Sequence, residues 1–347
     1  MTKKLLLAHK KAELLNHGKI YIPHEIKMPY PLDRSTAGPG AGKTSIAFSN
    51  DNMNVKLEVT RNDSNNIFSL KETNNGFCIF KNNNIFLNEI NIIPTLFHAP
   101  EQIFINIENR CIHNCKFCTS NTGKETFLSK YDEHKFVDFI LGALKCSNLK
   151  TVALTSGIYP SNNKIIKKMV FIIKNVKKNF PNIPIGVEPC ITKKEDIMDL
   201  KEAGADEIKI NLQISDEKLF EKICPDFDQT QIFMMLNAAV KIFGKEKVTS
   251  NILYGLGENE DILIDSIGKL AKIGVVPTLR KIYVNDLNKA KIENALGKKI
   301  PVISADKMVD LAMKQKKIFE KYDLTTIKFK TMCHKCGCCD IVPFWDV

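Results

Sequence analysis

The feature that most constrains the fold is an alternation of strand-like and helix-like segments that begins near residue 102. Between the strand-like runs lie amphipathic segments with the apolar period of helices, over residues 132–145, 192–204 and 258–274. Repeated strand–helix units favour an α/β fold, a parallel sheet curled into a partial or full (βα) barrel, with its chemistry at the carboxyl ends of the strands. The six strand-like runs are IFINI (103–107), TVALTS (151–156), IPIGVE (183–188), EIKINLQ (207–213), VTSNILY (248–254) and TLRKIYV (278–284).

Local signals predict where some of the helices begin and end. Thr192 followed by Glu195 has the spacing of a capping box, and Gly204 is suited to the residue just past a helix. Ser304 predicts the start of a further helix over residues 305–322.

Three regions follow from these patterns. Residues 1–100 begin with an amphipathic helix and continue into short β-like runs separated by Asn-rich turns, which predicts a small antiparallel region. Residues 101–330 form the predicted barrel. Residues 331–347 are a Cys-rich tail that predicts a metal site.

The amino-acid composition narrows the range of partners that we expect for this protein. The net charge of +11 comes almost entirely from dispersed Lys, which indicates a solvated surface and leaves a nucleic-acid substrate as the less favoured alternative. No apolar run reaches the length of a membrane span, and the N-terminal apolar run is too short for a signal peptide, so we expect a cytoplasmic protein without a membrane partner. In that reducing compartment, eleven Cys indicate metal or redox chemistry rather than disulfides.

The stretch AGPGAGKTS (37–45) matches the loose pattern of a phosphate-binding loop through Ala37, Gly42, Lys43 and Thr44. Such a loop must join a buried strand to a helix, whose first amides face the phosphate. Here two Pro precede the stretch and extended structure follows it. We therefore predict a Gly-rich loop with no nucleotide-binding role.

A stronger signal is CIHNCKFC (111–118), which directly follows the first strand of the barrel. Cys111, Cys115 and Cys118 have the spacing C-x3-C-x2-C, and three thiolates can hold three irons of a [4Fe–4S] cluster while the fourth iron stays open to a ligand. A zinc site is the alternative, but it needs a fourth ligand nearby, and within the loop only His113 could supply one.

This motif resembles that of the radical S-adenosylmethionine (SAM) superfamily, including the aromatic residue before the third Cys, here Phe117. The resemblance implies that the open iron binds SAM and that Phe117 lies against its adenine. It also implies that an electron from the cluster breaks a C–S bond, giving a 5′-deoxyadenosyl radical that removes hydrogen from an unactivated C–H. It further implies a reductant such as ferredoxin or flavodoxin, and a small-molecule or carrier-bound substrate.

The same resemblance assigns SAM binding to later strand ends. The turn after the second strand would bind the methionine amino group, a carboxylate after the third would bind ribose hydroxyls or that amino group, and glycines after the fifth would approach the adenine. The residues at these places are Ser156, Gly157, Glu188, Asn211, Gln213, Gly255, Gly257 and Arg280.

Residues 200–223 and 255–263 look like the biotin synthase branch of the superfamily, and the resemblance covers residues 103–285. Biotin synthases hold a second, sulfur-donating cluster through Cys at strand ends. Cys190 falls at one such place, but Thr155 and Thr249 stand where others are expected. The chain is therefore predicted to be related to biotin synthase without being one.

The tail supplies four more thiols, which predict an auxiliary iron–sulfur cluster over the barrel mouth or, alternatively, a single metal ion. The reaction implied is C–H activation, with sulfur insertion into a cofactor or its precursor as one outcome. Radical methylation or rearrangement of a cofactor precursor, RNA or protein is an alternative, as is an iron–sulfur scaffold or electron carrier that does not turn over SAM. The tail thiols are Cys333, Cys336, Cys338 and Cys339.

Overall fold

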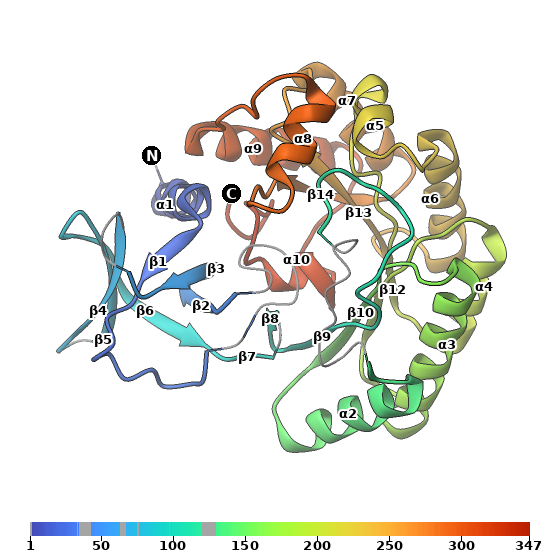
Figure 1. Cartoon of the computed structure of the whole chain (residues 1–347), viewed down its shortest axis with the longest axis horizontal. Coiled ribbons are helices and arrows are strands. Elements are labelled where there is room, and N and C mark those ends of the chain that lie inside the picture. The colour runs from blue at the N-terminus through green and yellow to red at the C-terminus, as the bar shows by residue number, and fades with distance from the viewer. Residues whose placement is uncertain are drawn as a thin grey trace.

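The computed structural model describes residues 2–32, 34, 43–62, 67–74, 76–96, 98–119 and 130–347. Within them, the chain forms a closed barrel of strands β1–β6 and an eight-stranded sheet in the order β14-β13-β12-β11-β10-β9-β7-β8. Figure 1 shows the small barrel on one side and the curved sheet with its covering helices on the other.

The N-terminal barrel follows helix α1 (Lys3–His17), which ends at Gly18 in the left-handed conformation. Its strands pair mostly antiparallel, as the short β-like runs and Asn-rich turns predict, but β1 runs parallel to β3 and β4 and closes the sheet on itself. The strands are β1 (Lys19–Tyr21), β2 (Ser45–Asn50), β3 (Met53–Thr60), β4 (Phe68–Thr73), β5 (Gly76–Lys81) and β6 (Asn84–Ile93).

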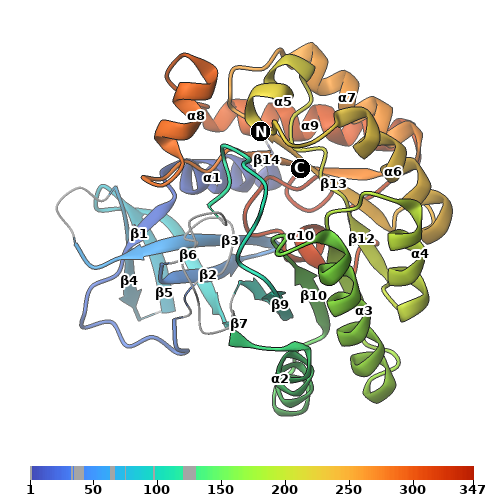
Figure 2. The ribbon, with the colours of Figure 1, turned by 45° about the vertical axis from the view of Figure 1, so that its right-hand side comes forward.

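The large sheet contains six consecutive parallel strands, β9–β14, preceded by the short hairpin β7–β8. The predicted α/β barrel is confirmed in its partial form, because these strands curl into a half-barrel whose outer face is covered by helices (Figures 1 and 2). The strands are β7 (Thr95–Leu96), β8 (Ala99–Pro100), β9 (Gln102–Asn106), β10 (Thr151–Thr155), β11 (Ile185–Glu188), β12 (Glu207–Lys209), β13 (Val248–Tyr254) and β14 (Val276–Lys281).

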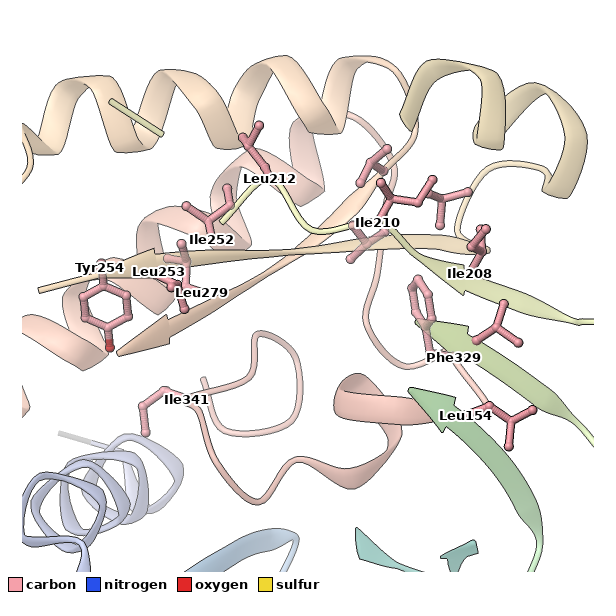
Figure 3. Packing of buried hydrophobic residues seen from close by; sticks show 14 of the residues in the cluster. Leu154, Ile208, Ile210, Leu212, Ile252, Leu253, Tyr254, Leu279, Phe329 and Ile341 are labelled. Carbon is pink, nitrogen blue, oxygen red and sulfur yellow. The ribbon is translucent and has the colours of Figure 1, made fainter. Parts of the chain in front are cut away.

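Apolar strand residues fill the layer between this sheet and its helices. Figure 3 shows members of one apolar cluster, with Leu154, Ile208 and Ile252 from three strands, and Phe329 and Ile341 from the C-terminal segment on the inner side of the sheet. The remaining helices are α2 (Glu133–Cys146), α3 (Asn162–Asn179), α4 (Lys194–Ala203), α5 (Glu217–Ile223), α6 (Gln229–Phe243), α7 (Glu260–Lys272), α8 (Lys289–Leu296), α9 (Ala305–Lys321) and α10 (Met332–Cys336).

Two of the predicted helix boundaries are confirmed and one is wrong. Gly204 ends α4 at φ 109°, and the Ser304 side chain accepts a hydrogen bond from the Lys307 amide at the start of α9. Thr192 does not cap α4, because its hydroxyl accepts a hydrogen bond from Asn162 and Lys193 takes the capping position.

The tail, residues 331–347, lies inside the curve of the sheet rather than over the barrel mouth (Figure 1). The side chain of Gln102 accepts a hydrogen bond from the Met332 amide at 2.7 Å and donates one to its carbonyl at 3.1 Å. The Glu207 carboxylate accepts bonds from the Lys330 and Thr331 amides at 2.8 and 3.0 Å. Polar side chains near the amino ends of the strands therefore supply hydrogen-bond partners to the backbone of the tail.

Close contact between the tail and the sheet also depends on Gly186 in β11. A Cβ atom there would lie 2.1 Å from Thr331 Oγ1 and 2.8 Å from Thr331 Cβ. A side chain at this position would therefore require Thr331 or the neighbouring part of the tail to shift. Among the described residues, no helix is both long enough and apolar enough to cross a bilayer.

Candidate active site

A cavity of about 380 Å³ lies at the carboxyl ends of the parallel strands, where the fold predicts chemistry. Its floor and walls include Asn106 after β9, Thr155 of β10 and Glu188 of β11. The loop 111–118 forms another wall, and Cys111, Cys115, Phe117 and Cys118 all line the cavity. The cysteine motif and the strand-end polar groups thus face the same space.

The cysteine loop is held by backbone bonds from three directions. The Ile112 amide donates to the Ile158 carbonyl at 2.9 Å, and the Lys116 amide donates to the Ile223 carbonyl at 2.8 Å. The buried Asn288 side chain donates to the Phe117 carbonyl at 2.9 Å. These contacts fix a loop that has no regular secondary structure of its own.

Gly157 allows the end of β10 to approach this loop. Its amide donates to the Glu108 carbonyl at 2.7 Å, and a Cβ atom on it would lie 2.3 Å from the Arg110 carbonyl oxygen. Since the opposing atoms belong to the backbone, they cannot rotate away. Gly157 and Ser156 both line the cavity, as the sequence predicts for the turn after the second strand.

Two thiols of this loop have raised pKa values, which favours their protonated form when no metal is bound. Burial raises the pKa of Cys111, and a hydrogen bond with Cys224, together with burial, raises the pKa of Cys115. A metal would displace these protons on binding, because thiolates are the ligands. Cys224 and Cys190 also line the cavity, so five thiols face it.

Sequence patterns did not reveal Cys224. It follows α5, far from the cysteine motif in the chain, and only the packing of α5 against the loop brings it beside Cys115. A lone Cys after a short helix carries no spacing signal of its own.

Glu188 and Asn211 are joined by a direct hydrogen bond. The Glu188 carboxylate accepts from Asn211 Nδ2 at 2.6 Å and from Lys209 Nζ at 3.2 Å. Asn211 Oδ1 in turn accepts from the Asn251 amide at 3.0 Å. Both side chains line the cavity, and Glu188 presents a charged acceptor in a fixed orientation.

Other predicted positions differ from expectation. β12 ends at Lys209, so Gln213 does not continue a strand; it has φ 67° but still lines the cavity. Gly255 and Gly257 are not among the residues that line it. The Glu258 carboxylate accepts a hydrogen bond from the Gly255 amide at 2.8 Å. The Gly255 amide is therefore already bonded within the turn.

Comparison with known proteins identifies the segment around this cavity. Residues 105–270 match the family model described as the Radical SAM superfamily. The chain contains a radical SAM domain. The matched segment begins in β9 and ends in α7, so it includes the cysteine loop.

Curated relatives of the radical SAM domain include biotin synthases. The chain is 27% identical over 164 residues to that of Sulfurihydrogenibium sp. (strain YO3AOP1), covering 46% of this chain and 48% of the relative. It is 30% identical over 159 residues to that of Endomicrobium trichonymphae, covering 45% and 47%. The chain spans about half the length of the curated relatives it matches, and these matches agree with a biotin synthase-related branch.

A solved structure supports the fold. The crystal structure of methylornithine synthase aligns with a TM-score of 0.50 at 18% identity, covering 62% of each chain. At this identity the likeness concerns the fold alone. The family match and the relatives that are named as enzymes support an enzyme of the radical SAM class.

A second group of thiols lies behind the cavity of the radical SAM domain. Cys333, Cys336, Cys338 and Cys339 line a small hollow together with His98. Arg280 lines both this hollow and the cavity, and its guanidinium donates to Asp340 Oδ2 at 2.8 Å and to Cys333 Sγ at 3.3 Å. The side chain predicted to bind SAM is thus engaged with the tail.

In neither thiol group do the described residues bring three Cys, His, Asp or Glu side chains close enough around one point to hold a single metal ion. An iron–sulfur cluster separates its thiolates with irons and sulfides, so it needs a wider spacing than one ion does.

The predicted Gly-rich loop lies largely outside the described residues, which exclude 37–42. Of its last residues, Lys43 Nζ lies 3.1 Å from Glu58 Oε1, and Thr44 forms an antiparallel bridge with Arg34. A carboxylate therefore already binds the Lys of the apparent phosphate-loop pattern.

Proposed function

We propose that this protein is a radical SAM enzyme that cleaves SAM reductively at a [4Fe–4S] cluster bound by Cys111, Cys115 and Cys118. The observation that carries the proposal is that these three thiols line one strand-end cavity together with Glu188 and Asn211. When bound, the cluster and SAM supply a 5′-deoxyadenosyl radical for C–H activation.

The residues of the chain bind and orient the cofactor. Glu188, held by Asn211 and Lys209, accepts hydrogen bonds from ribose hydroxyls or from the methionine ammonium group. Phe117 gives the adenine an apolar surface, and its position is fixed through Asn288.

Apolar side chains complete the cavity and protect a reactive intermediate from water. Ile210, Phe220, Phe227 and Leu253 line it between the polar groups. Exclusion of water prevents side reactions of a radical, which is the role this wall would have.

Sulfur insertion into a cofactor or its precursor is the reaction that the biotin synthase relatives favour. The substrate would be a small molecule or a carrier-bound group, and ferredoxin or flavodoxin would supply the electron. Radical methylation or rearrangement would instead leave the sulfur content of the product unchanged, so product analysis separates these reactions.

A second iron–sulfur cluster, bound by the four tail thiols, completes the proposal. Cys190 is the strand-end thiol at a biotin synthase-like place, and the described cavity wall has Thr155 where another thiol would be needed. The tail, in contrast, brings four thiols to one hollow.

The test of the first cluster is anaerobic reconstitution followed by reduction with dithionite in the presence of SAM. We expect 5′-deoxyadenosine from the wild type and none from Cys115→Ser. Cys146→Ser is the matched control, because Cys146 is exposed at the end of α2 and does not line the cavity. A fully loaded wild type that forms no 5′-deoxyadenosine would contradict the proposal and favour a scaffold or electron carrier.

A further inference from the structure

The tail segment from Cys336 to Cys338 has all three of its backbone carbonyls bonded to the N-terminal region, which consists of α1 and the small barrel β1–β6. The Cys336 carbonyl accepts a hydrogen bond from Asn54 Nδ2 at 3.2 Å, and the Gly337 carbonyl accepts one from Lys11 Nζ at 2.6 Å. The Cys338 carbonyl accepts one from the Lys56 amide at 3.1 Å. One helix and one strand that are distant in sequence thus hold three consecutive peptide units between the tail thiols.

Lys11 donates its bond from a fully buried position. Its side chain and that of Asp346 are each 1% exposed, and Lys11 Nζ lies 2.7 Å from Asp346 Oδ2. The same oxygen accepts a hydrogen bond from the Val342 amide at 2.7 Å. Because separating a buried ion pair leaves a charge unpaired, this pair keeps Lys11 in place against the Gly337 carbonyl.

The direction of these carbonyls decides where the amides of the segment point. In a planar trans peptide unit, the carbonyl and the amide that follows it point in opposite directions. The amides of residues 337–339 therefore point away from the N-terminal region. Two of them have partners on that side, since the Gly337 amide donates to the Cys333 carbonyl at 2.8 Å and the Cys338 amide donates to the Cys336 sulfur.

Hydrogen bonds to the sulfurs are one of the factors that set the reduction potential of an iron–sulfur cluster. We propose that the N-terminal region is part of the tail metal site, with Asn54 and Lys11 as its positioning residues. By holding the carbonyls of Cys336 and Gly337, these two side chains keep the segment in the orientation that turns the Cys338 amide toward sulfur.

This inference rests on the proposed tail cluster and adds a second part of the chain to its site. The segment that matches the radical SAM model, residues 105–270, contains none of the three donors and none of the four tail thiols. The site would therefore be assembled from segments on both sides of the radical SAM domain. A role for the N-terminal region follows that the cysteine motif alone does not suggest.

The experiment uses the full chain with Cys111, Cys115 and Cys118 all changed to Ala, so that the tail thiols are the remaining cysteine group. After anaerobic reconstitution, we expect equal amounts of iron and sulfide and a reducible cluster in electron paramagnetic resonance. Asn54→Ala in this chain should release iron to a chelator about fivefold faster, the effect of one lost hydrogen bond. It should also shift the midpoint potential to a more negative value, and because the substitution removes no charge, the shift reports weaker hydrogen bonding to sulfur.

Asn50→Ala is the matched control for Asn54→Ala. Asn50 lies at the end of β2 in the same small barrel, and its Nδ2 donates to a backbone carbonyl, that of Asn88, at 2.7 Å. This carbonyl belongs to the barrel and not to the tail. We expect iron release and midpoint potential to stay as in the parent chain.

Lys11 gives a second, independent pair of variants. Lys11→Met should release iron faster than Asn54→Ala does, and Lys11→Arg should restore most of the retention, because Arg can donate to both partners of Lys11. The control is Lys177→Met in α3, since Lys177 Nζ also donates to a carbonyl, that of Ile183 at 2.9 Å, and to a carboxylate, that of Asp206 at 2.8 Å. We expect Lys177→Met to lower thermal stability without changing iron release.

Unchanged iron release together with an unchanged midpoint potential in folded Asn54→Ala would overturn the inference and leave the tail cluster standing. A folded triple variant that binds no iron, or that binds zinc without sulfide, would overturn the tail cluster and the inference together. If Lys11→Met does not fold, Asn54→Ala and Asn50→Ala decide alone. If the triple variant does not fold, the same variants are compared in the otherwise wild-type chain, where the iron lost on Cys336→Ser identifies the share of the tail. None of these measurements depends on 5′-deoxyadenosine formation, so failure of SAM cleavage is detected separately.

Discussion

The two cysteine groups of this protein differ in what surrounds them. The loop at 111–118 is half-buried, borders a cavity of about 380 Å³ and is fixed mainly by backbone hydrogen bonds. The tail group at 333–339 is mostly buried and borders only a small hollow, and Lys209 and Arg280 contact its Cys333 thiol. The first environment suits a cluster that must bind an external ligand. The second suits a cluster that never meets one.

Each group also depends on one glycine at a close contact. Gly157 brings the end of β10 against the backbone before Cys111, and Gly186 brings β11 against Thr331 before Cys333. Substitution of either glycine therefore disturbs one cysteine group and leaves the other in place.

The largest effect is expected for Gly157→Ala. The added Cβ would lie 2.3 Å from the Arg110 carbonyl oxygen, so the cysteine loop must shift. A misplacement of about 1 Å in a reactive site can lower a rate about 100-fold, and we expect a loss of that order in 5′-deoxyadenosine formation. Gly142→Ala in α2 is the control, because no atom lies within 4 Å of its added Cβ. Wild-type activity in Gly157→Ala would show that the loop tolerates the contact.

A smaller effect on SAM cleavage but a clear loss of stability is expected for Gly186→Ala. Thr331 cannot move aside freely, since its amide and hydroxyl both bond to Glu207. Overpacking of this kind costs about 1–3 kcal/mol of unfolding free energy, measurable by urea denaturation. Iron bound by the tail should fall, while iron bound by Cys111, Cys115 and Cys118 remains. Equal losses from both groups would contradict their independence.

The third prediction concerns Lys281, a cation that lines the large cavity. Its Nζ donates to the neutral Asn16 Oδ1 at 2.6 Å, and burial lowers its pKa to about 8. Between about pH 8 and pH 10.5 the unfolded chain binds more protons at this residue, so its contribution to the unfolding free energy rises with pH.

The comparison with Lys281→Met measures this contribution. The wild type should gain stability relative to the variant as the pH rises through that window, which denaturation at two pH values would detect. A constant difference across the window would show that Lys281 titrates normally.

The smallest effect is expected for Lys43→Ala. Lys43 is more than half exposed and bonds Glu58, and such ion pairs contribute less than about 1 kcal/mol. SAM cleavage should be unchanged, because neither cysteine group involves this residue. A marked loss of cleavage would revive the phosphate-loop interpretation, with Thr44→Val as the second variant to examine.

Much of the fold could be predicted because its signals are local. Each parallel strand is an apolar run between turn residues, and the cysteine loop follows one such run directly. The errors also have local causes. β12 ends at Lys209, and the chain beyond it reaches a positive φ at Gln213. The Thr192 hydroxyl accepts a hydrogen bond from Asn162 instead of capping α4.

The position of the tail could not be predicted, since it depends on partners distant in the sequence. Gln102 and Glu207 are polar residues in buried strands, and their roles become clear only when the tail backbone is seen bonded to them. The same holds for Cys224 beside Cys115, and for Lys56, whose backbone amide donates to the Cys338 carbonyl from another sheet. Four closely spaced Cys predict a metal site without indicating which surfaces enclose it.

The bonds from Gln102 and Glu207 to the tail have a consequence for synthesis of the protein. Residues 330–332 are made after all the strands that they contact, so the interior of the half-barrel stays open to water until the ribosome has passed them. Iron and sulfide can reach the tail thiols during this interval. Once the tail has docked, most of these thiols are buried, so the proposed tail cluster would have to be delivered before docking.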